Sequence, residues 1–155
     1  MSLLKKVLVG LAVVIIILQF FGIDKENPVS NPSLDLITIV QPEEDVKQVL
    51  KNACYDCHSN LTKYPWYTNI TPLSWWIKDH IDEGRDELNF SEWGNYSDRR
   101  KDHKLEEVVE LVEEGEMPLQ SYTYAHSEAK LTTEQIELLL AWVKQTRSDI
   151  GYVKE

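Results

Sequence analysis

Cysteine is scarce in this sequence, and the shortage limits the sites that the chain can build. Of its 155 residues, only Cys54 and Cys57 are cysteines. A structural zinc site needs four ligands, and no second cysteine pair is present to complete one. A redox dithiol of the thioredoxin type needs a strand before the motif and a βαβ setting, and neither pattern surrounds Cys54. A disulfide between the two is possible in an oxidising compartment, but it would close a very small loop.

Basic residues are also few. The chain has 16 Lys and Arg against 26 Asp and Glu, which gives a formal net charge of −10. An acidic surface does not suit nucleic acid or an anionic lipid surface, so we expect no nucleic-acid partner. It suits a basic protein partner, or it simply keeps the protein soluble.

Alternation of apolar and polar residues is missing from residue 42 onward, and the chain has no internal repeat or low-complexity tract. Apolar residues recur there at helical spacing instead, with capping residues or glycine at the ends of the segments. The pattern therefore predicts an all-α domain. The four expected helices cover residues 42–53, 74–88, 98–115 and 132–147.

One long run has no charge at all: residues 7–23, with Lys5 and Lys6 before it and Asp24 after it. At about 1.5 Å per residue this is a short membrane span, and the lysines predict a cytoplasmic N-terminus. A signal-peptide cleavage site would need small residues just after the run, and none is present. We expect three parts: a signal anchor or transmembrane helix (1–23), a tether with an extended piece at 36–40 (24–41), and the domain (42–155).

The sequence does contain the pentapeptide Cys54-Tyr55-Asp56-Cys57-His58. Attachment of a c-type haem uses its two thiols and its histidine, because the thiols add across the two vinyl groups and the histidine binds the iron. A disulfide would leave His58 without a purpose. We therefore predict one covalent haem c on Cys54 and Cys57. In bacteria this attachment occurs outside the cytoplasm, so the haem domain is expected on the extracytoplasmic side of the cytoplasmic membrane, held by a single-pass anchor.

Met117 is the predicted second axial ligand. It follows Gly115, where a helix is expected to stop, and Pro118 biases it away from helical backbone, so its loop can lay a thioether across a haem face. The alternative is that Met117 fills a gap in the core. His80, inside a predicted helix, and His103 and His126, in polar surroundings, are the other candidate ligands.

These features together resemble a class I c-type cytochrome over about residues 42–146. The resemblance implies that the first and last helices cross near the haem edge, with Ala53 or Val49 against Trp142. The middle of the chain is similar to a more specific group, the haem-binding domain family. That likeness rests on Tyr64-Pro65-Trp66-Tyr67, Pro72, Trp75-Trp76, His80, Glu83-Gly84-Arg85, Asn89-Phe90-Ser91 and Trp93.

The aromatic middle is expected to wall the haem, above all through Trp66, Trp75 and Trp76, while Arg85 is a candidate partner for a propionate. A backbone carbonyl near Pro65 is a candidate to orient His58. The alternative is that the aromatic residues pack the domain without touching haem and that Arg85 pairs with a carboxylate at the surface.

An electron carrier, not an enzyme, is the expected function. With His58 and Met117 both bound, the iron has no open position, and a redox protein with a basic docking patch would be the partner. A peroxidase-type enzyme would need a base or an arginine above a free haem face, a task for His80 and Arg85. A haem-based sensor would need Met117 to be a displaceable ligand.

Overall fold

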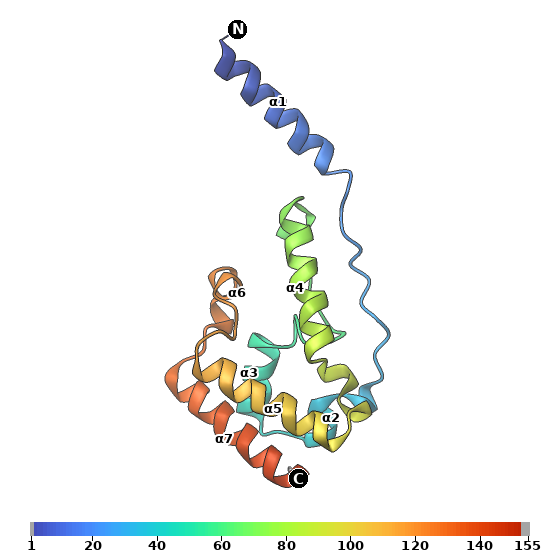
Figure 1. Cartoon of the computed structure of the whole chain (residues 1–155), viewed down its shortest axis with the longest axis vertical. Helices are drawn as coiled ribbons and strands as arrows, with labels where there is room; N and C mark the ends of the chain where they lie inside the picture. The colour runs from blue at the N-terminus through green and yellow to red at the C-terminus, as the bar shows by residue number, and fades with distance from the viewer. Residues whose placement is uncertain (1, 153–155) are drawn as a thin grey trace.

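The computed structural model describes residues 2–152, and every regular element in that range is helical. Two long helices, α5 (Asp98–Glu113) and α7 (Thr133–Ile150), pack side by side at one end of the molecule (Figure 1). The prediction of an all-α chain is confirmed. The other α-helices are α1 (Leu3–Leu18), α2 (Leu36–Val40), α3 (Glu44–Ala53), α4 (Leu73–Glu87) and α6 (Gln120–Ala125), and the 3₁₀ helices are η1 (Pro32–Leu34), η2 (Trp66–Asn69), η3 (Phe90–Asn95) and η4 (Ser127–Ala129).

The four predicted helices form with nearly the expected bounds, because their capping signals act locally. At the start of α7, the N–H of Gln135 donates to the Thr132 hydroxyl at 3.3 Å, and the Thr132 N–H donates to the Gln135 side chain at 2.9 Å. After α5, Gly115 takes a φ of 74°, which stops the helix without the strain that a Cβ would add.

The core lies where α3 and α5 pack against α7. Leu105 of α5 and Leu139 and Val143 of α7 are at most 1 % exposed. Burying each such side chain stabilises the fold by about 1.5–3 kcal/mol relative to leaving it in water. Because α3 packs against α7, the cysteine motif at the end of α3 begins next to this core.

Part of the segment expected to be a tether is packed into this core. Residues 36–40 form α2 instead of the extended piece that their β-branched side chains suggested, because the Asp35 carboxylate caps the helix by accepting from the Ile37 N–H at 2.9 Å. Leu36 is completely buried. The helix packs against η3, so this stretch of chain belongs to the wall of the domain.

The prediction of an N-terminal membrane helix is wrong. α1 has 16 residues, which at about 1.5 Å each reach about 24 Å, short of the roughly 30 Å of a bilayer's hydrocarbon core. Within residues 2–152, no helix combines the length and the apolar character needed to cross a membrane. The uncharged run continues to residue 23, but the helix stops at Leu18. Gln19 then exchanges two hydrogen bonds with the Thr71 backbone, at 2.8 and 3.1 Å.

A partly buried ion pair joins the two longest helices of the core. Arg147 of α7 donates to Asp102 of α5 at 2.8 and 3.3 Å and to Glu106 at 3.2 Å. The Asp102 side chain is 7 % exposed. A second pair between the same helices, Lys144 with Glu113 at 3.3 Å, is more than half exposed on both sides.

These two pairs give a matched test of what holds α5 to α7. Arg147→Ala should lower the free energy of unfolding by about 2–4 kcal/mol, because it leaves the buried Asp102 without its guanidinium. Lys144→Ala should cost less than about 0.5 kcal/mol, because the exposed pair is solvated either way. Urea unfolding followed by far-UV circular dichroism measures both, and equal costs would contradict the assignment.

Candidate functional site

The cysteine motif begins where α3 ends. Cys54 caps the helix, and its carbonyl accepts hydrogen bonds from the N–H groups of Cys57 at 3.2 Å and His58 at 2.9 Å. These bonds wind the motif into a tight turn, and Cys54, Cys57 and His58 all line one cavity. Tyr55 does not line it: it stacks on Phe90 with 5.1 Å between ring centroids and is buried in the core.

The imidazole of His58 is held in one orientation by the end of α4. Its Nδ1 lies 2.9 Å from the carbonyl oxygen of Gly84 and 3.0 Å from that of Leu88, so Nδ1–H is the donor and Nε2 is left as a free ligand atom. Burial lowers the pKa of His58, although the two carbonyls act in the opposite direction. The ring is therefore neutral at neutral pH. The sequence suggested a carbonyl near Pro65 for this task, and the structure assigns it to Gly84 and Leu88.

Glycine at position 84 allows that approach. A Cβ there would lie 3.0 Å from the Cys57 carbonyl oxygen and 3.3 Å from the Cys57 Cβ, closer than backbone atoms normally permit. α4 continues through this residue to Glu87. Gly84 is thus the place where α4 presses against the cysteine turn.

Cys54 and Cys57 form no disulfide with each other. Burial raises the pKa of Cys54 to about 12, and the nearby Cys57 sulfur adds to this shift. Burial also raises the pKa of Cys57 to about 11, and the nearby Asp56 carboxylate adds to that shift. Catalytic dithiols need the opposite shift, because the thiolate is their nucleophile. Within residues 2–152 no three His, Cys, Asp or Glu side chains are grouped to hold a metal ion, so the zinc interpretation gains no support.

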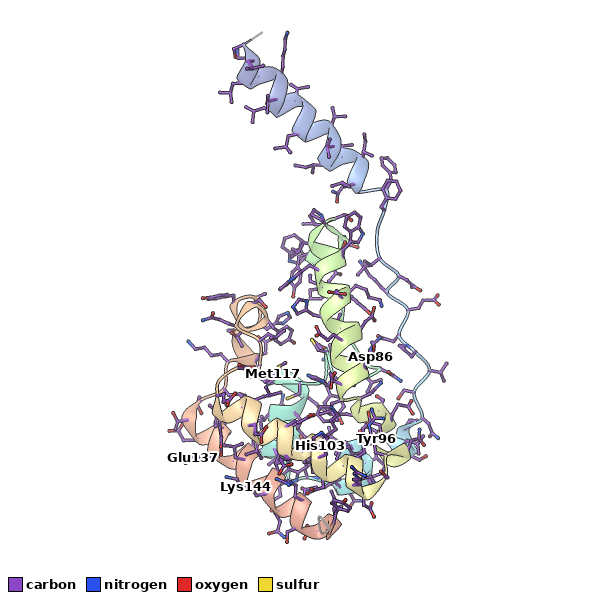
Figure 2. The ribbon with its side chains drawn as sticks, in the orientation of Figure 1. Asp86, Tyr96, His103, Met117, Glu137 and Lys144 are labelled. Carbon is purple, nitrogen blue, oxygen red and sulfur yellow. The ribbon has the colours of Figure 1, made fainter. Side chains whose placement is uncertain are left out.

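Met117 reaches the same cavity from the loop after α5. Beyond Gly115, the N–H groups of Glu116 and Met117 both donate to the Leu111 carbonyl, at 2.9 and 3.1 Å, which ties the loop to the helix end. The Met117 side chain is partly buried against the core and lines the cavity. Figure 2 shows it near the middle of the helical domain.

The cavity has a volume of about 630 Å³, within the roughly 300–1,000 Å³ typical of cofactor sites. Apolar side chains of α3, α5 and α7 form one part of its wall. Ala53 and Trp142, the contact implied by the cytochrome resemblance, are both among them. The apolar wall residues include Leu50, Ala53, Leu105, Val108, Leu111, Val112, Leu139, Trp142 and Val143.

The charged part of the lining is acidic. Glu83, Glu87, Glu107 and Glu110 border the cavity, and Lys104 is the one basic side chain in the described lining. Lys104 pairs with Glu87 at 2.8 Å and with Glu107 at 2.7 Å. Burial acts to lower the pKa of Lys104. The hydrogen bonds that Lys104 donates to Glu107 and Glu87 have a larger opposite effect, so the net shift of the pKa is upward. Its charge is therefore already neutralised by the rim.

The three tryptophans predicted to wall the haem lie elsewhere in the described structure. Trp66 is 75 % exposed, and Trp75 donates its indole N–H to the Phe21 carbonyl at 2.8 Å. Trp76 lines a second cavity, of about 390 Å³, which also borders Cys57. Their contact with haem stays a prediction.

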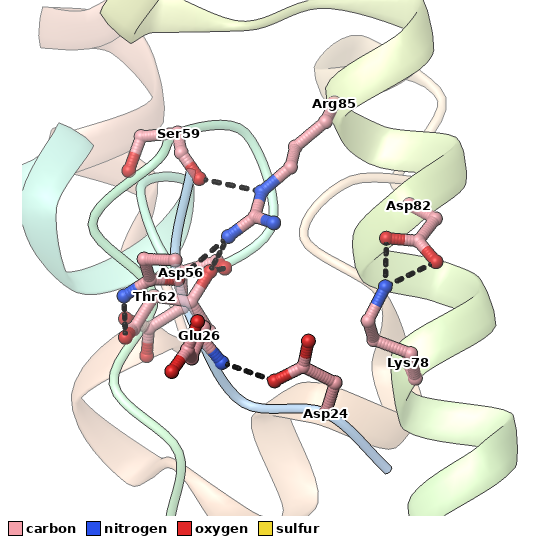
Figure 3. Close-up of polar contacts among 9 residues, drawn as sticks. Asp24, Glu26, Asp56, Ser59, Thr62, Lys78, Asp82 and Arg85 are labelled. Atoms are coloured by element: carbon pink, nitrogen blue, oxygen red, sulfur yellow. Dashed lines mark hydrogen bonds and ion pairs between the residues drawn. The ribbon is translucent and has the colours of Figure 1, made fainter. Parts of the chain in front are cut away.

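Arg85 also lies outside the lining of the 630 Å³ cavity, in the part of the chain that is described. Its guanidinium donates to the Ser59 carbonyl at 2.9 Å and to the Thr62 hydroxyl and the Asn27 side chain at 2.8 Å (Figure 3). Arg85 thus braces the loop that follows His58 against the N-terminal segment. Its role as a propionate partner stays a prediction.

The other three histidines each have a partner of their own. His103 is exposed and pairs with Glu107 at 3.2 Å, and His126 bonds through Nε2 to the Tyr67 hydroxyl. His80 lines the cavity, but it lies one turn before Gly84 on α4, the helix that backs His58, and its Nδ1 bonds to the Trp76 carbonyl at 2.8 Å. Met117 approaches from a separate segment.

The sequence model of the haem-binding domain family matches residues 13–145. The chain belongs to the haem-binding domain family. This match confirms the resemblance that the aromatic residues between positions 64 and 93 indicated. It supports haem binding by this protein. No curated protein and no solved structure matches the chain.

The cavity fits the cofactor that the family implies. An iron porphyrin needs an apolar slot and an unprotonated nitrogen, and the cavity offers apolar walls and the free Nε2 of His58. The same lining supplies two thiols and one thioether. The groups that could bind or attach a haem therefore line the same cavity that has room for it.

Sequence reasoning missed the structural roles of Gly84, Leu88 and Tyr122. Leu88 acts through its backbone, which leaves no trace in residue type. Tyr122 of α6 lines the cavity and donates to the Asp56 carboxylate at 2.8 Å. Gly84 did carry a signal: it is a glycine inside a strongly patterned helix with no stop after it, and such a glycine often marks a close approach of two backbones.

The close approach at Gly84 predicts an unusual outcome for a helix substitution. Gly84→Ala should improve helix propensity by about 1 kcal/mol but cost more in displaced backbone, for a net loss of about 1–2 kcal/mol in unfolding free energy. Gly10→Ala in α1 is the matched control, because a Cβ there meets nothing within 4 Å. Urea unfolding of the haem-loaded protein measures both, and a Gly84→Ala variant as stable as the parent would contradict the assignment.

Proposed function

We propose that this protein is a c-type cytochrome that carries electrons through one haem bound covalently to Cys54 and Cys57. The observation that carries the proposal is that Cys54, Cys57, His58 and Met117 line one apolar cavity, with the Nε2 of His58 left free. When bound, the haem supplies one-electron redox chemistry. The chain's own contribution is to hold it, to orient its ligands and to exclude water.

His58 and Met117 are proposed as the two axial ligands. A neutral imidazole with its far nitrogen hydrogen-bonded to carbonyls is a strong nitrogen donor, and a thioether is a neutral ligand that raises the reduction potential. Two protein ligands leave no open coordination position, which suits an electron carrier better than an enzyme. A peroxidase-type site has less support, because Arg85 is hydrogen-bonded elsewhere and His80 lies on the helix that backs His58.

The acidic surface supports a basic redox partner. The chain carries a net charge of −10, and four carboxylates border the haem cavity. Complementary charge speeds the encounter of redox proteins and orients it. Because thioether attachment of this kind takes place outside the cytoplasm in bacteria, we place the working protein there.

Covalent attachment can be tested by removing the thiols. The wild-type protein should keep its haem through acidic acetone extraction, whereas the Cys54→Ala/Cys57→Ala double variant should release it. Each single variant should retain the haem through one remaining thioether. Absorbance of the extracted and the precipitated fractions gives the result, and haem that stays with the double variant would refute the attachment.

Ligation by Met117 has a separate spectroscopic test. The oxidised wild-type protein should show a low-spin spectrum with a sulfur-to-iron charge-transfer band, and Met117→Ala should lose that band and show a lower reduction potential. His126→Ala is the control, because that ring is bonded to Tyr67 and should leave the band in place. A high-spin wild type, or one that binds carbon monoxide at native pH, would instead favour the enzyme or sensor alternative.

A further inference from the structure

A second cavity, of about 390 Å³, lies between α4 and α6, the two helices that rise on the same side of the α5–α7 pair (Figure 1). Leu73, Trp76 and Ile77 of α4 face Ala125 of α6 across it. Several of its lining residues, Leu73, Trp76 and Ala125 among them, are also exposed, so the cavity has a route to the surface.

This cavity adjoins the proposed haem site. Cys57, His80, Leu119 and Tyr122 line both cavities. A molecule in the second cavity would therefore lie next to Cys57, the second of the two proposed attachment residues. Close contact of this kind permits electron transfer without a protein partner between the two.

The lining contains several hydrogen-bond acceptors, together with a cation, the exposed Lys63. The Tyr122 hydroxyl is already donated to Asp56, at 2.8 Å, and the Tyr67 hydroxyl is paired with the His126 ring. Each phenol oxygen and the Asp56 carboxylate can still accept a further hydrogen bond. Burial raises the pKa of Tyr67, with further contributions from nearby negative groups. The acceptors at Tyr67, Tyr122 and Asp56 thus suit a ligand that donates hydrogen bonds.

Tyr64 adds one donor. Its ring lines the cavity, and its hydroxyl is buried with no hydrogen-bond partner among residues 2–152. A buried hydroxyl in this condition is rare and is normally satisfied by a ligand or an ordered water. An oxygen on a bound ring would provide the missing acceptor.

We propose that this second cavity binds a small hydroquinone, a flat aromatic ring with two hydroxyl groups, as an electron donor. The proposal rests on the proposed function, because the electrons pass to ferric haem. One hydroquinone loses two electrons and two protons and leaves as the quinone. Two ferric copies of the protein each accept one electron, and the two protons pass to solvent water at the exposed side of the cavity. The apolar faces of Trp76 and Ile77 cover the ring, while acceptors such as Tyr67 and Asp56 bind its hydroxyls.

Binding can be measured without electron transfer. Tetramethylhydroquinone is the probe, because its substituted ring cannot add to thiols, and the ferrous haem-loaded protein under anaerobic conditions cannot accept its electrons. Equilibrium dialysis should show saturable binding to the wild type. Ala125→Trp, at an exposed position in the cavity lining, should weaken binding about ten-fold or more by filling the space. Ser121→Trp, exposed and also in the lining, is a second blocking variant.

Tyr124→Trp is the matched control. It lies on the same helix, is 81 % exposed and borders neither described cavity, so binding should change by less than about two-fold. Unchanged binding in both blocking variants would overturn the proposal. Binding of the probe by the haem-free chain but not by the haem-loaded wild type would also overturn it, because the haem itself would then fill the space. The oxidised wild-type spectrum separates the two proposals: a high-spin spectrum with intact binding would sink the His58/Met117 ligation and leave the second site standing.

Discussion

The contact between the end of α4 and the His58 ring is the constraint on which the rest of the site depends. The end of α4 aims two backbone oxygens that lie four residues apart, those of Gly84 and Leu88, at one ring nitrogen. The Gly84 oxygen also accepts from the Leu88 N–H, at 3.0 Å. The contact with the ring fixes the tautomer, the direction of the free nitrogen and the separation between α4 and the cysteine turn. It also places the negative end of a helix dipole behind the ligand, which increases its basicity.

Opposing influences would act on an iron held as proposed. An imidazole hydrogen-bonded to carbonyls and a rim of carboxylates would stabilise the oxidised, more positive state, whereas a thioether and an apolar cavity would stabilise the reduced state. Lys104 does not alter this balance much, because two of those carboxylates already neutralise it. Under the proposed ligation, the chain would have two separate means of adjusting the reduction potential: the hydrogen bonds of His58 and the packing of Met117.

Local signals in the sequence were enough to predict most of the helices and the cysteine motif. The Thr132–Gln135 capping box and the stop at Gly115 depend on a few neighbouring residues, so they could be located without a structure. Interactions between distant segments could not. The partners of Arg85 come from residues 27, 59 and 62, and nothing in its neighbourhood along the chain distinguishes them from a propionate. The uncharged run at the N-terminus misled in the opposite way, because hydropathy alone did not show that the helix would end before Gln19.

The burial of Asp35 and Leu36 has a consequence for how much of the chain the domain requires. Tyr55, the first spacer residue between the two cysteines, donates its hydroxyl to Asp35 at 3.0 Å, while Leu36 has no exposed surface. Proteolytic trimming at the predicted start of the domain, residue 42, would remove both. It would leave a cavity in the hydrophobic core, and the Tyr55 hydroxyl beside the cysteine turn would lose its hydrogen-bond partner. The minimal haem-holding unit therefore begins before α2, and the N-terminal segment is part of the cofactor's support.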